Sequence, residues 1–332
     1  MKHSMKIKII TLANHRPDFI EPQYQSIKRF VKDTDVEYVI FNTASEDQKR
    51  YDEIESICKK LGTQSIPVKK SKLLKFWKEN VSKSVARSLN YIWKNHLKNE
   101  KDIVVIIDSD MFFIKDVSIE QLMNGYNFAF VPAYRGKKFE VLYPWTGLMF
   151  FNMNTLPSPE KMRWDTGSVL GNKVDVGGMN HFYLQEHVEN LKVLRLEMWN
   201  LENIENNTDG SRTILCNLNG NVRFEIHITK DNALINLTTK DFFVSDKKSL
   251  PYQSERENYY NFIKDNFLAF EQYLKNKNAD FPKPFWMDLF KTENADIADS
   301  FVFHYKSGSN WLPFYTEEYN KKKTEELRKL LI

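Results

Sequence analysis

Cysteine is scarce in this sequence. Cys58 and Cys216 are the only two cysteines in 332 residues, and they lie far apart. They provide neither the close ligand spacing of a zinc site nor enough thiols for a disulfide framework, and no Ser-His-Asp arrangement stands out. We therefore expect two reduced, buried thiols, which suits a reducing compartment.

Long apolar runs are absent as well. The apolar stretch at residues 7–13 is short, contains Lys8 and Thr11, and is not followed by a small-residue cleavage site. No segment approaches the roughly 18 apolar residues that a membrane-spanning helix requires. We therefore expect a cytoplasmic chain with no signal peptide or transmembrane segment, in which the Asn-x-Thr sequons at Asn206 and Asn236 occur by chance.

The sequence has little excess charge of either sign. It contains 48 basic and 44 acidic residues, which gives a net charge of +4. Nucleic-acid-binding proteins usually concentrate basic charge on one face, so this balance argues against a nucleic-acid partner. The short lysine runs at 69–70, 137–138 and 321–323 are interpreted as solvated surface, with a local phosphate or anionic-membrane site as the alternative.

The sequence does contain enough apolar material for a folded core. Hydrophobic residues make up 42% and charged residues 28% of the chain, which is a globular composition. Strand-like and helix-like segments alternate through the first half, and this alternation predicts an open α/β sheet with helices on both sides. We expect strands at 6–13, 37–42, 63–69 and 102–108, and helices at 21–32, 47–62 and 80–98.

The second half of the chain is less regular. We expect strands at 127–133 and 146–153, a long loop region at 157–180, a helix at 181–191, a β-hairpin from 219–226 and 232–239, a helix at 255–276, a strand leading into a loop at 301–311 and a surface helix at 316–332.

Two aspartates follow the unbroken apolar run at 103–107, and such a run is typical of a parallel strand covered on both faces. Ligands of open α/β sheets bind beyond the carboxyl ends of the strands, where Asp108, Ser109 and Asp110 lie. In an extended chain, the side chains of Asp108 and Asp110 would point to the same face. Two close carboxylates repel each other unless a cation such as Mg²⁺ or Mn²⁺ offsets their charge. An ordinary surface turn or helix cap is the alternative, but the apolar run at 111–114 argues against a solvated turn.

The segment IVVIIDSDMFF, residues 103–113, resembles the D-x-D strand end of GT-A glycosyltransferases. The resemblance extends over most of the chain, including the opening strand and loop, IITLANHRPDF. It implies a GT-A fold, with a Rossmann-like, mostly parallel central sheet, flanking helices and an irregular C-terminal acceptor-binding half. It also implies one domain over residues 1–332, with a nucleotide-sugar-binding half up to about residue 135 and an acceptor-binding half from about residue 136.

The same resemblance implies roles for residues near the two strand ends. Arg87 lies on the helix before the D-x-D strand and would contact the nucleotide or a D-x-D carboxylate, with an exposed helix charge as the alternative. Asp108 and Ser109 would contact the donor. The base pocket would be lined by Thr11, Ala13 and Asn14.

A second motif near the C-terminus, HYKSGSNW at residues 304–311, is similar to the late His motif of several GT-A families. The resemblance implies that His304 joins Asp108 and Asp110 as a ligand of Mn²⁺ or Mg²⁺, and imidazole is a good ligand for Mn²⁺. It implies that Lys306 and Gly308 lie against the diphosphate, and a glycine permits that close approach. The ending Ser-Asn-Trp differs from the Lys-Pro-Trp of the glycogenin-like family, so we assign no family within GT-A. A core histidine is the alternative for the motif.

An acceptor-facing strand is expected in the segment LYPWTGLMFFNM. Trp145 would stack on a sugar, with a core role as the alternative, and Thr146 and Gly147 would lie near the transferred sugar. The loop that follows presents Asp165 and Asp175, each near a glycine.

Asp175 is our candidate for the base that deprotonates the acceptor hydroxyl in an inverting transferase. A turn or helix-cap aspartate is the alternative. The His304 motif favours retention and Asp175 favours inversion, so the sequence leaves the stereochemistry open.

We therefore predict a metal-dependent hexosyl- or pentosyltransferase that moves a sugar from a nucleoside diphosphate sugar, with UDP-sugar as the default donor, to a glycan or other hydroxyl acceptor. One alternative is a metal-dependent nucleotidyl- or phosphotransferase. The absence of a P-loop motif argues against it. The other is a non-catalytic carbohydrate-binding protein.

Overall fold

The computed structural model describes residues 5–68, 81–135, 141–196, 198–206, 208, 212–218, 222–228, 233–237, 295–298, 301–305, 321, 324, 325 and 328. Contacts group the chain into two compact units. The first consists of Met1–Met198 with Asp296–Ile332, and the second of Trp199–Ala295. The predicted single domain with halves that meet near residue 135 stays a prediction.

The first unit is built on a seven-stranded sheet in the order β10-β6-β7-β4-β1-β2-β3. Only β7 runs antiparallel to its neighbours, and the other pairs are parallel. This is the mostly parallel α/β sheet that the alternating sequence pattern predicts, so the predicted fold class is confirmed. The strands are β1 (Ile7–Ala13), β2 (Val36–Asn42), β3 (Gln64–Pro67), β4 (Ile103–Ile107), β6 (Phe128–Arg135), β7 (Val141–Asn152) and β10 (Val193–Arg195).

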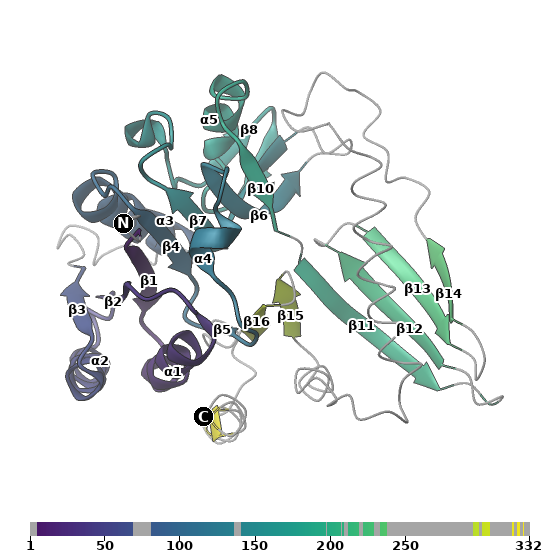
Figure 1. Ribbon diagram of the computed structural model, residues 1–332, viewed down its shortest axis with the longest axis horizontal. Coiled ribbons are helices and arrows are strands. Elements are labelled where there is room, and N and C mark those ends of the chain that lie inside the picture. The colour runs from purple at the N-terminus through teal and green to yellow at the C-terminus, as the bar shows by residue number, and fades with distance from the viewer. Residues whose placement is uncertain are drawn as a thin grey trace. The chain divides into compact units, whose positions relative to one another are not determined.

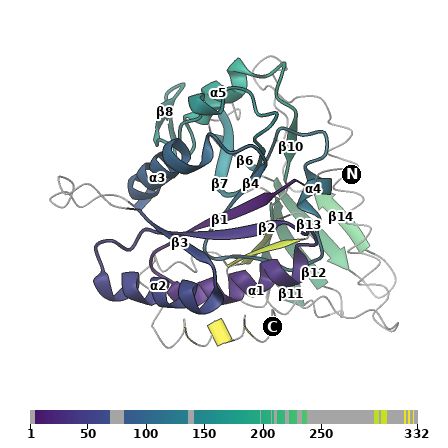
Figure 2. The same ribbon diagram turned by 60° about the vertical axis from the view of Figure 1, so that its left-hand side comes forward.

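Helices cover both faces of this sheet (Figures 1 and 2). On the face of α1 and α2, the Tyr38 hydroxyl of β2 donates a hydrogen bond to Gln23 of α1. On the opposite face, Phe41 packs edge-on against His96, in the continuation of α3. These helices are α1 (Ile20–Phe30), α2 (Gln48–Leu61), α3 (Val81–Ile92) and the π-helical turn η3 (Trp93–Leu97).

The sequence patterns predict α2 well and the end of α3 poorly. Gly62 ends α2 with a φ of 66°, in the left-handed region that favours glycine at this position, as expected. The predicted helix at 80–98 instead becomes a π-helix from Trp93, whose carbonyl accepts a hydrogen bond from the Lys98 amide at 2.9 Å. The Trp93 indole packs against Phe151 and Trp164, and this tertiary packing is invisible to helical periodicity.

The first unit also contains strands that lie outside the central sheet. Strand β5 (Met111–Phe113) runs antiparallel to β16 (Val302–Tyr305), with His304 opposite Met111. The region 157–180, predicted as a loop, contains a small hairpin formed by β8 and β9. Gly171 has a φ of 76°, which the turn between these strands requires. The other elements are η1 (Pro17–Phe19), α4 (Ile119–Leu122), η4 (Pro159–Lys161), β8 (Gly167–Val169), β9 (Asn172–Val174) and α5 (Asn180–Glu186).

The second unit contains four antiparallel strands in sequence order, and the predicted hairpin forms its last pair. The strands are β11 (Met198–Asn206), β12 (Arg212–Leu218), β13 (Val222–Ile228) and β14 (Ala233–Leu237). Strand β15 (Ala295–Ala298) belongs to the first unit from Asp296 onward. The predicted helix at 255–276 lies outside the described residues. Within the described part of the chain, no helix is both long and apolar enough to cross a bilayer.

Candidate functional site

Two loops of the central sheet flank its topological switch point. From β1, the strand order runs to β2 and β3 on one side and to β4 and β7 on the other. Ligands of open α/β sheets bind in the crevice outside such a switch point. The loops after β1 and β4 begin at Asn14 and Asp108, so the two segments singled out in the sequence lie at this position.

The D-x-D motif is a tight turn and not an extended chain. The Met111 amide donates to the Asp108 carbonyl at 3.1 Å, which closes a four-residue turn with Ser109 and Asp110 at its centre. The extended geometry expected from the i, i+2 spacing is therefore wrong. The reason is that the chain leaves β4 of the central sheet and immediately enters β5, which pairs with β16.

Neighbouring strands hold the backbone of this acidic turn, residues 108–111. The Asp108 amide donates to the Gly147 carbonyl of β7, and the Tyr305 amide of β16 donates to the Asp110 carbonyl, both at 2.8 Å. The turn thus joins the predicted acceptor strand to the strand that carries His304.

The acidic side chains of the turn are close to one another and to His304. Asp110 and His304 are 4% and 8% exposed, and Oδ1 of Asp110 lies 3.7 Å from Nε2 of His304. Burial and then the charge of Asp110 raise the pKa of Asp108 to about 7, while His304 acts in the opposite direction. Without a cation, Asp108 and Asp110 therefore resist simultaneous ionisation.

The residues present fit a divalent cation. Two ligands of one Mg²⁺ or Mn²⁺ ion, each about 2.1 Å from it, can lie up to about 4 Å apart, and the separation of Asp110 and His304 is within this limit. Within the described part of the chain, no three His, Cys, Asp or Glu side chains converge as in a complete metal site. Such ions commonly take one or two carboxylates together with substrate phosphates and water, so an incomplete protein shell is compatible with binding.

The side chain of Trp145 packs over Gly147 beside the acidic turn. The Trp145 indole lies 5.3 Å from the His304 ring, centroid to centroid. It also occupies the space over Gly147, where a Cβ would lie 2.0 Å from Cη2 of the indole. Glycine at position 147 therefore lets the indole lie flat across β7 next to His304. Trp145 is only half-buried, so part of its ring remains accessible.

We expect Gly147→Ala to lower the free energy of unfolding by about 1–3 kcal/mol, because the added methyl group forces the Trp145 ring away from the strand. Urea denaturation of the single variant and of Gly147→Ala/Trp145→Leu measures this. The double variant should regain most of the loss. Strictly additive losses would mean that the indole is not what excludes a side chain at position 147.

The turn with the sequence Asp-Val-Gly-Gly packs on the same strand. A Cβ on Gly177, whose φ is 81°, would lie 3.0 Å from the Pro144 carbonyl oxygen and from Cγ2 of Thr146. This turn therefore lies directly against the segment that carries Trp145. Asp175 is exposed, and its Oδ1 accepts a hydrogen bond from the Val176 amide at 2.8 Å. The contact is that of a turn aspartate.

Asp165 is tied to helix α3. Its Oδ1 accepts from Nδ2 of Asn90 at 3.0 Å, and its Oδ2 accepts from Arg163 at 3.3 Å. Oδ1 of Asn90 in turn accepts from the Trp164 amide, so one asparagine of α3 fixes the loop that holds Asp165.

The predicted donor-binding residues lie at different depths. Thr11 and Ala13 are 1% exposed within the end of β1, and the Ala13 carbonyl accepts hydrogen bonds from the amide and hydroxyl of Thr43. Asn14 and Ser109 are half-buried, and Arg87 is exposed on α3. Their roles stay predictions, and Lys306 and Gly308 lie outside the described residues.

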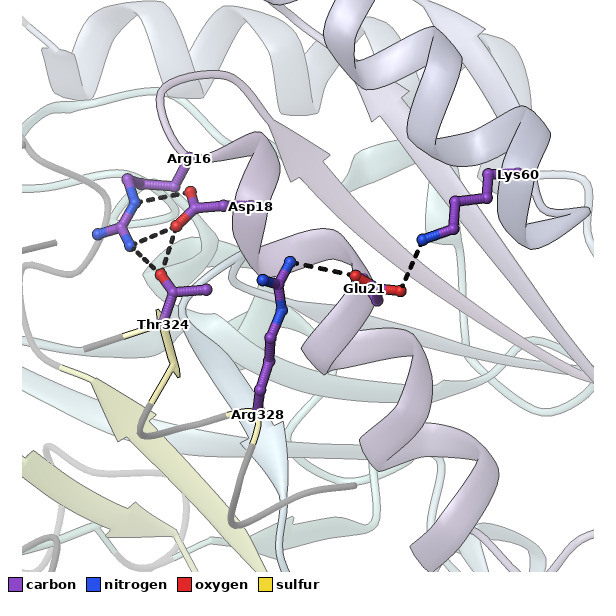
Figure 3. A network of polar contacts seen from close by, with 6 residues as sticks. All are labelled: Arg16, Asp18, Glu21, Lys60, Thr324 and Arg328. Atoms are coloured by element: carbon purple, nitrogen blue, oxygen red, sulfur yellow. Dashed lines mark hydrogen bonds and ion pairs between the residues drawn. The ribbon is translucent and has the colours of Figure 1, made fainter. Parts of the chain in front are cut away.

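Sequence reasoning missed a buried ionic cluster in the loop after β1 (Figure 3). The Arg16 guanidinium is 4% exposed, stacks on Phe19, and donates to both carboxylate oxygens of Asp18 at 2.8 and 2.7 Å. It also donates to the Thr324 hydroxyl at 2.7 Å, and this hydroxyl donates to Asp18. Burial alone would raise the pKa of Asp18, but the hydrogen bonds and charge of Arg16 outweigh this and lower it.

Figure 3 also shows an ion pair with α1, in which Arg328 donates to Glu21 at 3.1 Å. The described C-terminal residues therefore anchor to the segment that follows the predicted base pocket. Arg16 and Thr324 are 308 positions apart, and no local pattern signals such a contact.

Comparisons with solved structures find glycosyltransferases with low similarity. Mannosyltransferase PcManGT from Pyrobaculum calidifontis, in complex with GDP-Man and Mn²⁺, is 13% identical with a TM-score of 0.38, over 58% of this chain and 55% of that one. Mannosyltransferase Ktr4p from S. cerevisiae is 14% identical with a TM-score of 0.34, over 46% and 57%. Galactosyltransferase LgtC, with donor and acceptor sugar analogues, is 12% identical with a TM-score of 0.34, over 56% and 66%.

The chain thus spans between 55% and 66% of the lengths of these three structures. No protein-family model and no curated protein sequence matches it. Its function therefore has to be inferred from its own residues.

Proposed function

We propose that the chain is a metal-dependent glycosyltransferase that transfers a sugar from a nucleoside diphosphate sugar to a glycan or other hydroxyl acceptor. One observation carries the proposal, namely an acidic turn at the sheet's switch point, in which the buried Asp110 lies 3.7 Å from His304. A switch-point crevice suits a nucleotide, and a pair of carboxylates that resist joint ionisation suits a cation that binds its diphosphate.

The donor would lie across the loops after β1 and β4. Asn14 would contact the base or ribose above a floor formed by Thr11 and Ala13, and Ser109 would face the donor from the centre of the acidic turn. Arg87, Lys306 and Gly308 are proposed to contact the nucleotide or its diphosphate, as the sequence resemblance implies. UDP is the favoured nucleotide, and the GDP-Man in the PcManGT structure makes GDP the alternative to test.

Asp108, Asp110 and His304 would hold the cation, Mn²⁺ or Mg²⁺. When bound, such an ion supplies charge neutralisation at the leaving diphosphate. The protein's own contribution is to shield Asp110 and His304 from water, since both are less than a tenth exposed.

The acceptor would bind along β7. Trp145 offers a half-exposed ring for a sugar face, and Thr146 and Gly147 lie between this ring and the turn that carries Asp175. Asp165 is proposed to contact the acceptor from its position beside α3. In the transfer, the acceptor oxygen bonds to the anomeric carbon while the bond from that carbon to the diphosphate oxygen breaks.

Asp175 would take the acceptor proton if the enzyme inverts, and a retaining enzyme would not need it. The anomeric configuration of the product decides between them. An inverted product, with activity lost in Asp175→Asn, would assign the base. A retained product would remove Asp175 from the chemistry and leave the transferase proposal intact.

The proposal is tested first by calorimetric titration of UDP and GDP with and without Mn²⁺. We expect nucleotide binding that requires the metal, followed in a donor screen by release of free nucleoside diphosphate. Release of pyrophosphate would point to nucleotidyl transfer. Absence of nucleotide binding with either nucleotide would contradict the proposed function and favour a carbohydrate-binding protein.

A further inference from the structure

A single buried amide holds both ends of the acidic turn. Gln23 of α1 is 1% exposed, and its Nε2 donates to the Asp108 carbonyl at 2.8 Å and to the Met111 carbonyl at 2.7 Å. These are the first and last residues of the turn, and the Met111 amide already closes it onto the Asp108 carbonyl. Both hydrogens of the Gln23 amide are therefore used to fix the separation of the turn's two ends.

Tyr38 fixes the orientation of that amide. Its hydroxyl, on β2, donates to Oε1 of Gln23 at 2.5 Å, and the ring is 6% exposed. Burial raises the pKa of Tyr38 well above its usual value, so the hydroxyl keeps its proton and remains a donor. With Oε1 occupied by a donor, only the NH₂ group of Gln23 can face the two carbonyls.

We propose that Gln23, oriented by Tyr38, is a positioning residue that sets the conformation of the acidic turn and thereby the affinity for a divalent cation with a nucleoside diphosphate. Gln23 touches no reacting group and acts only through the turn. The part that concerns affinity rests on the function proposed above. The part that concerns the turn stands on the hydrogen bonds alone.

The test uses Gln23→Leu, which keeps the approximate size of the side chain and removes both donors. Tyr38→Phe is the milder variant, since it removes only the hydroxyl that orients the amide. Ser26→Ala is the matched control. Ser26 is fully buried on the same helix, and its hydroxyl donates to the Gln23 carbonyl and accepts from the Phe113 amide just beyond the turn.

Two readouts separate positioning from stability. The first is hydrogen exchange of the Met111 amide, which is bonded to the Asp108 carbonyl and reports opening of the turn. The second is nucleotide affinity with and without Mn²⁺. We expect Gln23→Leu to speed exchange and to weaken Mn²⁺-dependent binding by about tenfold or more, as for other groups that orient metal ligands, with metal-free binding unchanged.

Tyr38→Phe should show a smaller change in the same direction, and the double variant should be no worse than Gln23→Leu because both act through one amide. Ser26→Ala should lower the melting temperature but leave both readouts at wild-type values. If Gln23→Leu does not fold, Tyr38→Phe carries the test.

The outcomes separate the two proposals. Unchanged Met111 exchange in Gln23→Leu, or in Tyr38→Phe if only that variant folds, would overturn the role of Gln23. So would faster exchange with unchanged Mn²⁺-dependent affinity. A wild-type protein that binds no nucleotide overturns the proposed function instead, and the role in the turn is then decided by the exchange rates.

Discussion

Asp110→Asn is expected to lower sugar transfer by about a thousandfold and to abolish Mn²⁺-dependent nucleotide binding. A cation at a leaving diphosphate supplies several kcal/mol of transition-state stabilisation, and about 4 kcal/mol corresponds to a factor of roughly a thousand. Asp110 is the carboxylate nearest His304, at 3.7 Å, so its loss removes the centre of the proposed ligand group. Steady-state assays and titration calorimetry with the identified donor measure both effects.

The fold should survive this substitution. Asp110 also contacts β16 through its backbone carbonyl, which accepts from the Tyr305 amide and is retained in asparagine. Removing one of two repelling carboxylates should leave the metal-free protein at least as stable as the wild type. Asp116→Asn is the matched control, because Asp116 is an exposed carboxylate paired with Lys32 beyond β5. Wild-type activity in Asp110→Asn would remove the acidic turn from the proposed mechanism.

The sequence predicts the scaffold of this site better than its details. The apolar run before Asp108 identifies β4, and all five of its residues are buried between helices on the two faces of the sheet. The left-handed Gly62 ends α2 where expected. These features are local, because they depend on residues a few positions apart, and alternation and capping signals capture them.

The arrangement around the acidic turn depends on contacts between distant residues. Gln23 contacts the turn across 85 to 88 positions, and its helix has only an ordinary amphipathic pattern in the sequence. The clash that requires glycine at position 147 arises because the Trp145 ring folds over the strand, which sequence spacing does not specify. The conversion of the D-x-D segment from extended chain to turn follows from the pairing of β5 with β16. No residue within the motif indicates that pairing.

The stability of the metal-free protein should depend on pH through Asp108. In the folded state its pKa is raised from 3.8 to about 7, first by burial and then by the charge of Asp110, with His304 opposing. An acid with a raised pKa binds more protons in the folded than in the unfolded state at pH values between its unfolded and folded pKa. The contribution of Asp108 to the free energy of unfolding therefore falls as pH rises from about 4 to 7, by up to a few kcal/mol, and is constant above 7.

Because paired carboxylates elsewhere titrate in the opposite sense, the informative quantity is the difference between wild type and Asp108→Asn. Asp18 and Glu37, for example, have lowered pKa values and lose stabilising interactions as pH falls. Urea denaturation at pH 5 and pH 8, in the presence of a chelator, should show Asp108→Asn gaining stability relative to wild type at pH 8 more than at pH 5.

Saturating Mn²⁺ should reverse this pH dependence, since a bound cation favours the ionised carboxylates and stabilises the folded state in proportion to its affinity. The metal should therefore raise the wild-type melting temperature more at pH 8 than at pH 5 and should have little effect on Asp108→Asn. A pH-independent difference between the two metal-free proteins would show that burial and the charge of Asp110 do not raise the pKa of Asp108 in the folded state. The acidic turn would then lack the electrostatic strain that makes a cation favourable there.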